Sequence, residues 1–231
     1  MHRFEQDVGF WLEQARRGGG LVLELACGTG RITTPLARQG VRIVGLDNDP
    51  AMLRAAHRLA GSGLGASAEA DGASYRPLFV AADMRQFALA CRFQLVSVAY
   101  NSLQLLTTPA DTVACLTAAR QHVAAGGLVG VEVTDFQGGG ADDDDSPSRD
   151  LVPLADAEGI RLSGNLVHDL KRRISRYRRH FTGEGWEVDN EVVVRSIDRA
   201  ELSTHLAAAA LEPVRWWEAG ASIRTLARPL P

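Results

Sequence analysis

A glycine-rich turn between an apolar strand and a helix is the feature that most constrains this sequence. The strand is expected over residues 21–25, and the turn that follows it reads Glu24-Leu25-Ala26-Cys27-Gly28-Thr29-Gly30. Glycine lets the backbone approach a ligand closely, and the first turn of a helix leaves its N–H groups without intrahelical partners. The pattern therefore predicts a ligand cradle at one edge of a parallel sheet.

The residues around this turn alternate between short aliphatic strands and helical segments, which is typical of an α/β fold. Expected strands cover residues 21–25, 41–46, 77–81, 93–99 and 128–133, followed near the C-terminus by 214–218 and 223–227. Expected helices cover residues 31–39, 50–60, 111–124 and 198–210. We expect Gly126-Gly127 to stop the third helix and Asp198 to be the N-cap of the fourth.

A different pattern separates the fifth expected strand from the last helix. Residues 160–169, 170–181 and 186–197 have the composition of antiparallel strands, with Gly183-Glu184-Gly185 as a hairpin turn. We predict a Rossmann-like seven-stranded, mostly parallel sheet with an antiparallel β insertion. We expect one domain over residues 1–231, with its core at about 1–137 and 198–231 and the insertion at about 138–197.

Composition excludes several other classes of protein. Of the 231 residues 45% are hydrophobic and 23% are charged, as in ordinary globular proteins. The net charge of −3 argues against nucleic acid as a partner, and no apolar run is long enough to span a membrane. The cysteines, Cys27, Cys91 and Cys115, form no metal-binding pair, so we expect no metal and a cytoplasmic location.

Two acids follow the next strands of the predicted sheet. Asp47 ends the second strand, where a carboxylate can accept both ribose hydroxyls of a nucleoside. Asp83 follows the third strand. Because the carboxyl ends of parallel strands share one edge, one nucleoside-sized ligand could contact both acids and the glycine turn.

These motifs, in this order, resemble those of class I S-adenosylmethionine-dependent methyltransferases. The segments that carry the resemblance are Glu24 to Gly30, Gly45-Leu46-Asp47, Pro50 to Leu53, Ala82-Asp83-Met84-Arg85, Phe93 to Val96 with Asn101-Ser102-Leu103, and His122 to Gly127. The resemblance covers roughly residues 20–135. It implies S-adenosylmethionine as the cofactor.

The resemblance also implies roles for individual residues. Glu24, Ala26, Gly28 and Gly30 would line the methionine part of the cofactor, Asp47 would hold the ribose, and Met52, Asp83 and Met84 would contact the adenine. Thr29 and Asn48 would also bind the cofactor. Tyr100 would approach the sulfonium. The candidates for facing the substrate are Tyr100, Asn101 and Gln104, and no catalytic base is assigned.

Other interpretations of the glycine turn explain fewer of these residues. A dinucleotide fingerprint requires Gly or Ala where Thr33 stands, and it does not explain Glu24. A turn that only packs a strand on a helix would not explain the two ordered acids. A module that binds the cofactor without catalysis, or serves as a partner subunit, remains the alternative to an enzyme.

The acceptor is expected to be a small molecule, methylated on nitrogen rather than oxygen, because no committed general base is evident. The insertion resembles that of small-molecule N-methyltransferases, where it covers the active site or pairs subunits, so a homodimer is expected. Phe4, Phe10 and Trp11 could replace the aromatic lid residues of those relatives.

A basic run, Lys171 to His180, could bind a phosphate or carboxylate, but a solvated strand is favoured. On a strand its charges divide between two faces. We also expect Asp142 to Asp145 to neutralise part of this run.

Overall fold

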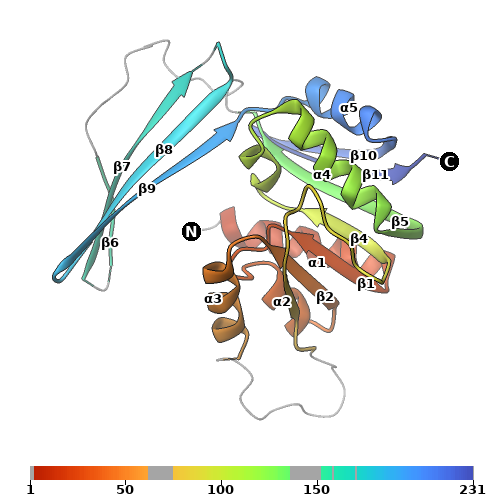
Figure 1. Ribbon diagram of the computed structural model, residues 1–231, viewed down its shortest axis with the longest axis horizontal. Coiled ribbons are helices and arrows are strands. Elements are labelled where there is room, and N and C mark those ends of the chain that lie inside the picture. The colour runs from red at the N-terminus through yellow and green to blue at the C-terminus, as the bar shows by residue number, and fades with distance from the viewer. Residues whose placement is uncertain (1–2, 62–74, 136–151, 158, 170, 231) are drawn as a thin grey trace.

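The computed structural model describes residues 3–61, 75–135, 152–157, 159–169 and 171–230. These residues form two sheets. A seven-stranded sheet with helices on both faces makes the body of the protein, and a four-stranded antiparallel sheet projects from it (Figure 1). None of the helices in the described ranges is long and apolar enough to cross a membrane.

The large sheet is mostly parallel. Its strands are β1 (Leu21–Leu25), β2 (Arg42–Asp47), β3 (Leu78–Ala81), β4 (Phe93–Val98), β5 (Val123–Thr134), β10 (Leu211–Ala219) and β11 (Ser222–Pro229). They lie in the order β10-β11-β5-β4-β1-β2-β3. β1 to β5 pair in parallel, and β11 runs antiparallel between β5 and β10. The predicted fold class is confirmed.

The helices are α1 (Arg3–Gly18), α2 (Thr33–Arg38), α3 (Pro50–Gly61), α4 (Pro109–Gln121) and α5 (Arg199–Ala208), with a 3₁₀ turn η1 (Ser102–Leu105). Alternation along the strands builds a separate core on each face: Val22 packs in the cluster that contains Leu36 of α2, and Leu23 in the cluster that contains Leu116 of α4. Asp198 caps α5 as predicted, since its carboxylate accepts the N–H of Glu201 at 2.8 Å.

The boundaries of α4 correct the sequence prediction. The helix begins at Pro109 because Thr108, through its hydroxyl, accepts the N–H of Asp111 at 3.1 Å, and it ends at Gln121. Gly126-Gly127 therefore does not stop the helix but lies within β5. A Cβ on Gly127 would come within 2.9 Å of the carbonyl oxygens of Phe93 and Gln94, so glycine here permits close approach to β4.

The sequence analysis did not predict α1, which packs on the sheet. Trp11 is only 1% exposed and its ring lies against Gly130 of β5. Phe10 contacts Trp11 and Trp217 edge to face, with ring centroids 5.0 Å apart in both pairs. Phe10 and Trp11 thus serve the core, and the expectation that they form a lid is wrong. The side chain of Phe4 lies outside the described residues.

The projecting sheet contains β6 (Val152–Ala157), β7 (Ile160–Asp169), β8 (Ile174–Gly183) and β9 (Trp186–Arg195), in that order. The antiparallel insertion and its Glu184-Gly185 turn are confirmed, and β6 is an additional strand. β8 begins at Ile174 rather than at residue 170, since Asp169 accepts the N–H of Arg172 at 2.9 Å and Arg173 has a left-handed backbone (φ +57°).

Part of the basic run is neutralised within the sheet. Glu191 of β9 accepts a hydrogen bond from Arg176 at 3.2 Å and from Arg178 at 2.8 Å. This arrangement supports the interpretation of a solvated strand for these two arginines. Asp142 to Asp145 lie outside the described residues.

The contact between Trp11 and Gly130 predicts the effect of added volume. A Cβ on Gly130 would lie 2.6 Å from the Trp11 ring, so Gly130→Ala should destabilise the protein by about 1–3 kcal/mol. Gly9 of α1 is the matched control because it is exposed and a Cβ there meets nothing within 4 Å. Gly9→Ala should be neutral or stabilising by about 0.5–1 kcal/mol. Urea unfolding measures both, and equal effects would contradict the proposed packing of α1.

Candidate functional site

The loop between β1 and α2 contains two glycines with different surroundings. Gly28 and Gly30 both have positive φ, +55° and +78°. A Cβ on Gly30 would come within 2.9 Å of the Thr34 hydroxyl and 3.2 Å of the Phe79 ring, so Gly30 packs the loop on the sheet. A Cβ on Gly28 would meet nothing within 4 Å. The backbone at Gly28 is therefore the part of the loop open to a ligand.

Asp47 connects this loop to the end of β2. One carboxylate oxygen accepts the N–H of Gly28 at 2.8 Å, and the other accepts the N–H of Asp49 at 2.9 Å. Each carboxylate oxygen can accept a second hydrogen bond, so Asp47 can still receive two ribose hydroxyls. Asn48 and Met52 are exposed at the same edge of the sheet. The residues expected to bind a ribose are thus brought beside the open glycine.

Glu24 lies under the loop and is almost fully buried. Its carboxyl accepts a short hydrogen bond from the hydroxyl of Thr33. Burial raises the pKa of Glu24 to about 7, and the bond from Thr33 and the charge of Arg31 only partly offset that rise. A cationic group held at this end of the loop would favour the ionised form.

Cys27, within the same loop, is not a nucleophile. Burial, followed by the charges of Glu24 and Asp47, raises the pKa of its thiol far above the usual range. A neutral thiol at this position packs under the loop and does not react.

Asp83 is already engaged by a neighbouring residue. Its carboxylate accepts from the Arg85 guanidinium at 2.7 Å and from the Arg85 backbone N–H at 2.8 Å. These hydrogen bonds lower the pKa of Asp83, and Arg85 also pairs with Asp111 at 2.8 Å. Met84 packs against the core. An adenine contact by Asp83 and Met84 stays a prediction.

Tyr100 lies just beyond the end of β4 in a left-handed conformation (φ +55°). Its N–H donates to the buried carboxylate of Glu132 at 3.0 Å, and Glu132 also pairs with Arg224 at 2.8 Å. The guanidinium of Arg31 lies 5.5 Å from the centre of the Tyr100 ring. Tyr100 is 46% exposed, so its side chain is accessible at the carboxyl edge of the sheet.

The sequence analysis missed four residues that support this edge: Asp7, Arg31, Glu132 and Arg224. Asp7 of α1 binds Arg31 through two hydrogen bonds, at 2.7 and 3.0 Å. The one available signal was Glu132, an acid within an otherwise apolar strand. Nothing local in the sequence links Asp7 to Arg31.

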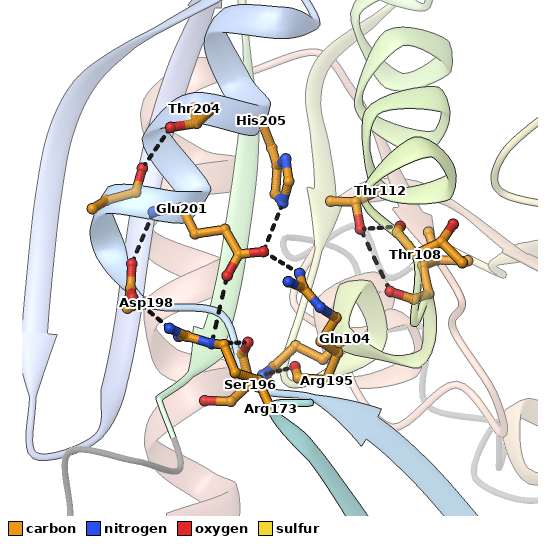
Figure 2. Close-up of polar contacts among 12 residues, drawn as sticks. Gln104, Thr108, Thr112, Arg173, Arg195, Ser196, Asp198, Glu201, Thr204 and His205 are labelled. Carbon is orange, nitrogen blue, oxygen red and sulfur yellow. Dashed lines mark hydrogen bonds and ion pairs between the residues drawn. The ribbon is translucent and has the colours of Figure 1, made fainter. Parts of the chain in front are cut away.

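Gln104 does not face a substrate, which corrects the sequence expectation. Its side chain is fully buried, and its amide nitrogen donates to the carbonyls of Thr134 at 2.8 Å and Arg195 at 2.7 Å. Its amide oxygen accepts the N–H of Thr134 at 2.7 Å. Gln104 therefore joins the end of β5 to the end of β9, and Figure 2 shows its bond to Arg195 of β9. Asn101 also faces this junction, since it accepts from the Thr134 hydroxyl at 2.7 Å.

Ion pairs between the insertion and α5 surround Gln104 (Figure 2). Arg173 pairs with Asp198 at 3.0 Å, and Glu201 pairs with Arg195 and, at 3.1 Å, with His205. The junction therefore fixes the path of the chain between the small sheet and the core.

The insertion also approaches Tyr100. Burial raises the pKa of Tyr177 in β8, and the next largest contribution comes from Tyr100. Tyr177 pairs with Val192 on β9, and the last residue of β9, Arg195, is bonded to Gln104, four residues after Tyr100.

Among the residues that the structure describes, no group of three His, Cys, Asp or Glu side chains could hold a metal ion.

Comparison with known proteins agrees with this geometry. Residues 22–127 match the model of the family described as "Methyltransferase domain". The Bacillus subtilis (strain 168) protein named "Putative methyltransferase YqeM" is 32% identical over 104 residues, which is 45% of this chain. This chain spans only 38% of the length of that relative.

Solved structures resemble the fold along nearly the whole chain. An S-adenosylmethionine-dependent methyltransferase from Clostridium acetobutylicum has a TM-score of 0.80 at 15% identity, covering 99% of this chain and 92% of its own. The CcbJ methyltransferase from Streptomyces caelestis has 0.81 at 20%, covering 99% and 90%. CalS10, an amino pentose methyltransferase from Micromonospora echinaspora, has 0.72 at 23%, covering 97% and 91%.

The predicted resemblance is therefore confirmed, since the matched segment carries every strand and loop from which it was inferred. Residues 22–127, which carry the glycine turn and Asp47, are therefore similar to a methyltransferase domain, and the chain shares its fold with solved S-adenosylmethionine-dependent methyltransferases.

Proposed function

We propose that this chain is an S-adenosylmethionine-dependent methyltransferase that methylates a small molecule, on nitrogen rather than oxygen. The observation that carries the proposal is the cradle itself, in which the open backbone at Gly28 lies beside the Asp47 carboxylate. The cradle fits a nucleoside, because each Asp47 oxygen keeps one acceptor position. The methyltransferase domain supplies the reaction class.

S-adenosylmethionine supplies an electrophilic methyl group when it is bound, and the protein aligns an acceptor with it. Asp47 would orient the ribose, and Glu24 would stabilise the cationic end of the cofactor. Tyr100, fixed through its N–H by Glu132, would border the acceptor. None of these roles requires a covalent bond to the protein.

Nitrogen is the preferred acceptor atom because Glu132, the carboxylate bonded to Tyr100, is already committed to other partners. Glu132 is held by Arg224 and by the N–H of Tyr100. An amine must only lose a proton after transfer, whereas a hydroxyl acceptor requires a general base.

The alternative is a module that binds the cofactor without catalysis. It would bind the adenosyl ligands as the enzyme does, so only turnover with an acceptor separates the two. Pairing of two copies through the insertion and a cytoplasmic location remain predictions.

The first test compares two glycines with the same backbone conformation. Gly28 (φ +55°) and Gly220 (φ +58°) both have open space at the Cβ position, so valine adds similar strain at either. S-adenosylmethionine and S-adenosylhomocysteine should raise the melting temperature of the wild type and of Gly220→Val, because both ligands bind the native state. Gly28→Val and Asp47→Ala should lose that shift. Their affinity for either ligand should fall at least about tenfold, which corresponds to ~1.4 kcal/mol of binding free energy.

Thermal-shift titration with both adenosyl compounds and NAD measures this effect. If neither adenosyl compound stabilises the wild type, the proposed cofactor is wrong. If Gly220→Val fails like Gly28→Val, backbone strain and not the cradle explains the loss.

The second test uses the pKa of Glu24. Because its folded pKa of about 7 lies above the ordinary value of 4.5, the folded state binds more protons between these pH values. Because of Glu24, the folded state therefore becomes less stable as the pH rises from 4.5 to 7. Glu24→Gln keeps an acceptor for Thr33 and removes the titration, so it should be more stable than wild type at pH 8, by about 1–3 kcal/mol, and equal at pH 4.5.

The same substitution should weaken S-adenosylmethionine binding at pH 8, because the cationic cofactor loses an ionised partner. Denaturant unfolding at the two pH values, with calorimetric titration of the cofactor, measures both effects. Lower stability together with unchanged affinity would exclude the role given to Glu24.

A further inference from the structure

The two faces of the insertion differ in how many charged side chains they carry. The register of β7, β8 and β9 places one set of side chains together, here called the Tyr177 face. It consists of Leu162, Gly164, Leu166, His168, Ser175, Tyr177, Arg179, Phe181, Val188, Asn190, Val192 and Val194. The acids of these three described strands, Asp169, Glu187, Asp189 and Glu191, all lie on the opposite face.

The arginines of β8 have different partners on the two faces. Arg176 and Arg178, on the face that carries the acids, both bind Glu191. Arg179, on the Tyr177 face, makes no ion pair within the part of the chain that the structure describes. Its Nε is buried and has no hydrogen-bond partner there. A half-buried guanidinium with an unmet donor loses hydration without compensation.

The neighbours of Arg179 provide no counter-ion. Its register partners are Gly164 on β7 and Asn190 on β9, and Tyr177 and Phe181 flank it along β8. His168, the other basic side chain in the Tyr177 face, is bonded to the Ser175 hydroxyl at 2.8 Å. Arg179 is thus a single cation in a largely apolar surface.

This surface borders the proposed acceptor site. Tyr177, two residues from Arg179 on β8, pairs with Val192 on β9, and β9 ends at Arg195, which is bonded to Gln104, four residues after Tyr100. The junction around Gln104 fixes the end of β9 against the core, which sets the orientation of the small sheet (Figure 2). An acceptor beside Tyr100 could therefore extend along the Tyr177 face towards Arg179.

We propose that Arg179 binds an anionic oxygen group, a phosphate or a carboxylate, on the methyl acceptor, while the apolar side chains around it contact the rest of that molecule. The planar guanidinium suits either group because it can donate two parallel hydrogen bonds. That the bound molecule is the methyl acceptor rests on the proposed function, whereas the anion site itself rests on Arg179 and its surroundings.

The test titrates the full-length protein, saturated with S-adenosylhomocysteine, with inorganic pyrophosphate and separately with succinate at constant ionic strength. Arg178→Gln is the matched control, since it removes the same charge one residue away on the opposite face. Wild type and Arg178→Gln should bind at least one anion saturably. Arg179→Gln should bind it about tenfold more weakly or not at all, and Arg179→Lys should lie between them.

The anion that binds distinguishes a phosphate-bearing from a carboxylate-bearing acceptor. Without anions, Arg179→Gln should melt at or above the wild-type temperature, because it removes an unmet donor. The proposal is overturned if neither anion binds the wild type saturably, if Arg178→Gln and Arg179→Gln lose binding equally, or if Arg179→Gln changes the mass measured by light scattering. That last result would assign Arg179 to a contact between two copies.

Failure of the proposed function gives a different pattern. In that case S-adenosylhomocysteine would not stabilise the wild type, while anion binding would still depend on Arg179. If the wild type binds S-adenosylhomocysteine but neither anion, only the assignment of Arg179 is overturned.

Discussion

The carboxylate of Asp47 is the contact on which the cradle depends. It holds the N–H of Gly28 from one strand end and the N–H of Asp49 from the next, so two loops of the parallel sheet share one anchor. This arrangement keeps the left-handed backbone at Gly28 in place without filling the space beside it. The ligand-facing geometry is therefore built before any ligand arrives, which lowers the cost of binding.

Glu24 and Asp47 show how environment separates two carboxyls at one site. Asp47 receives two backbone N–H donors, one on each carboxylate oxygen. Glu24 is buried with one hydroxyl donor, and its pKa near 7 leaves it partly protonated at neutral pH. A cation that binds beside Glu24 must draw that equilibrium towards the carboxylate, so binding and proton release are coupled.

The sequence was sufficient where the determining contacts are local. Gly28 and Asp47 could be identified because a strand, a turn and a helix follow one another along the chain. Gln104 could not, because its partners at Thr134 and Arg195 are 30 and 91 residues away, and nothing near Gln104 marks it as buried. α1 was missed for a related reason, since the burial of Trp11 depends on the absence of a side chain at Gly130.

The insertion illustrates the same limit at the level of a whole sheet. Alternation correctly divided the charges of β8 between two faces, but only the register with β9 shows that Glu191 neutralises Arg176 and Arg178. The same register leaves Arg179 without an acid among its cross-strand neighbours. Because Gln104 and Glu201 anchor this sheet at its junction with the core, the direction in which the Tyr177 face points is set by buried contacts far from Arg179. Specificity for an acceptor would then depend on how the insertion is held as much as on the side chains it presents.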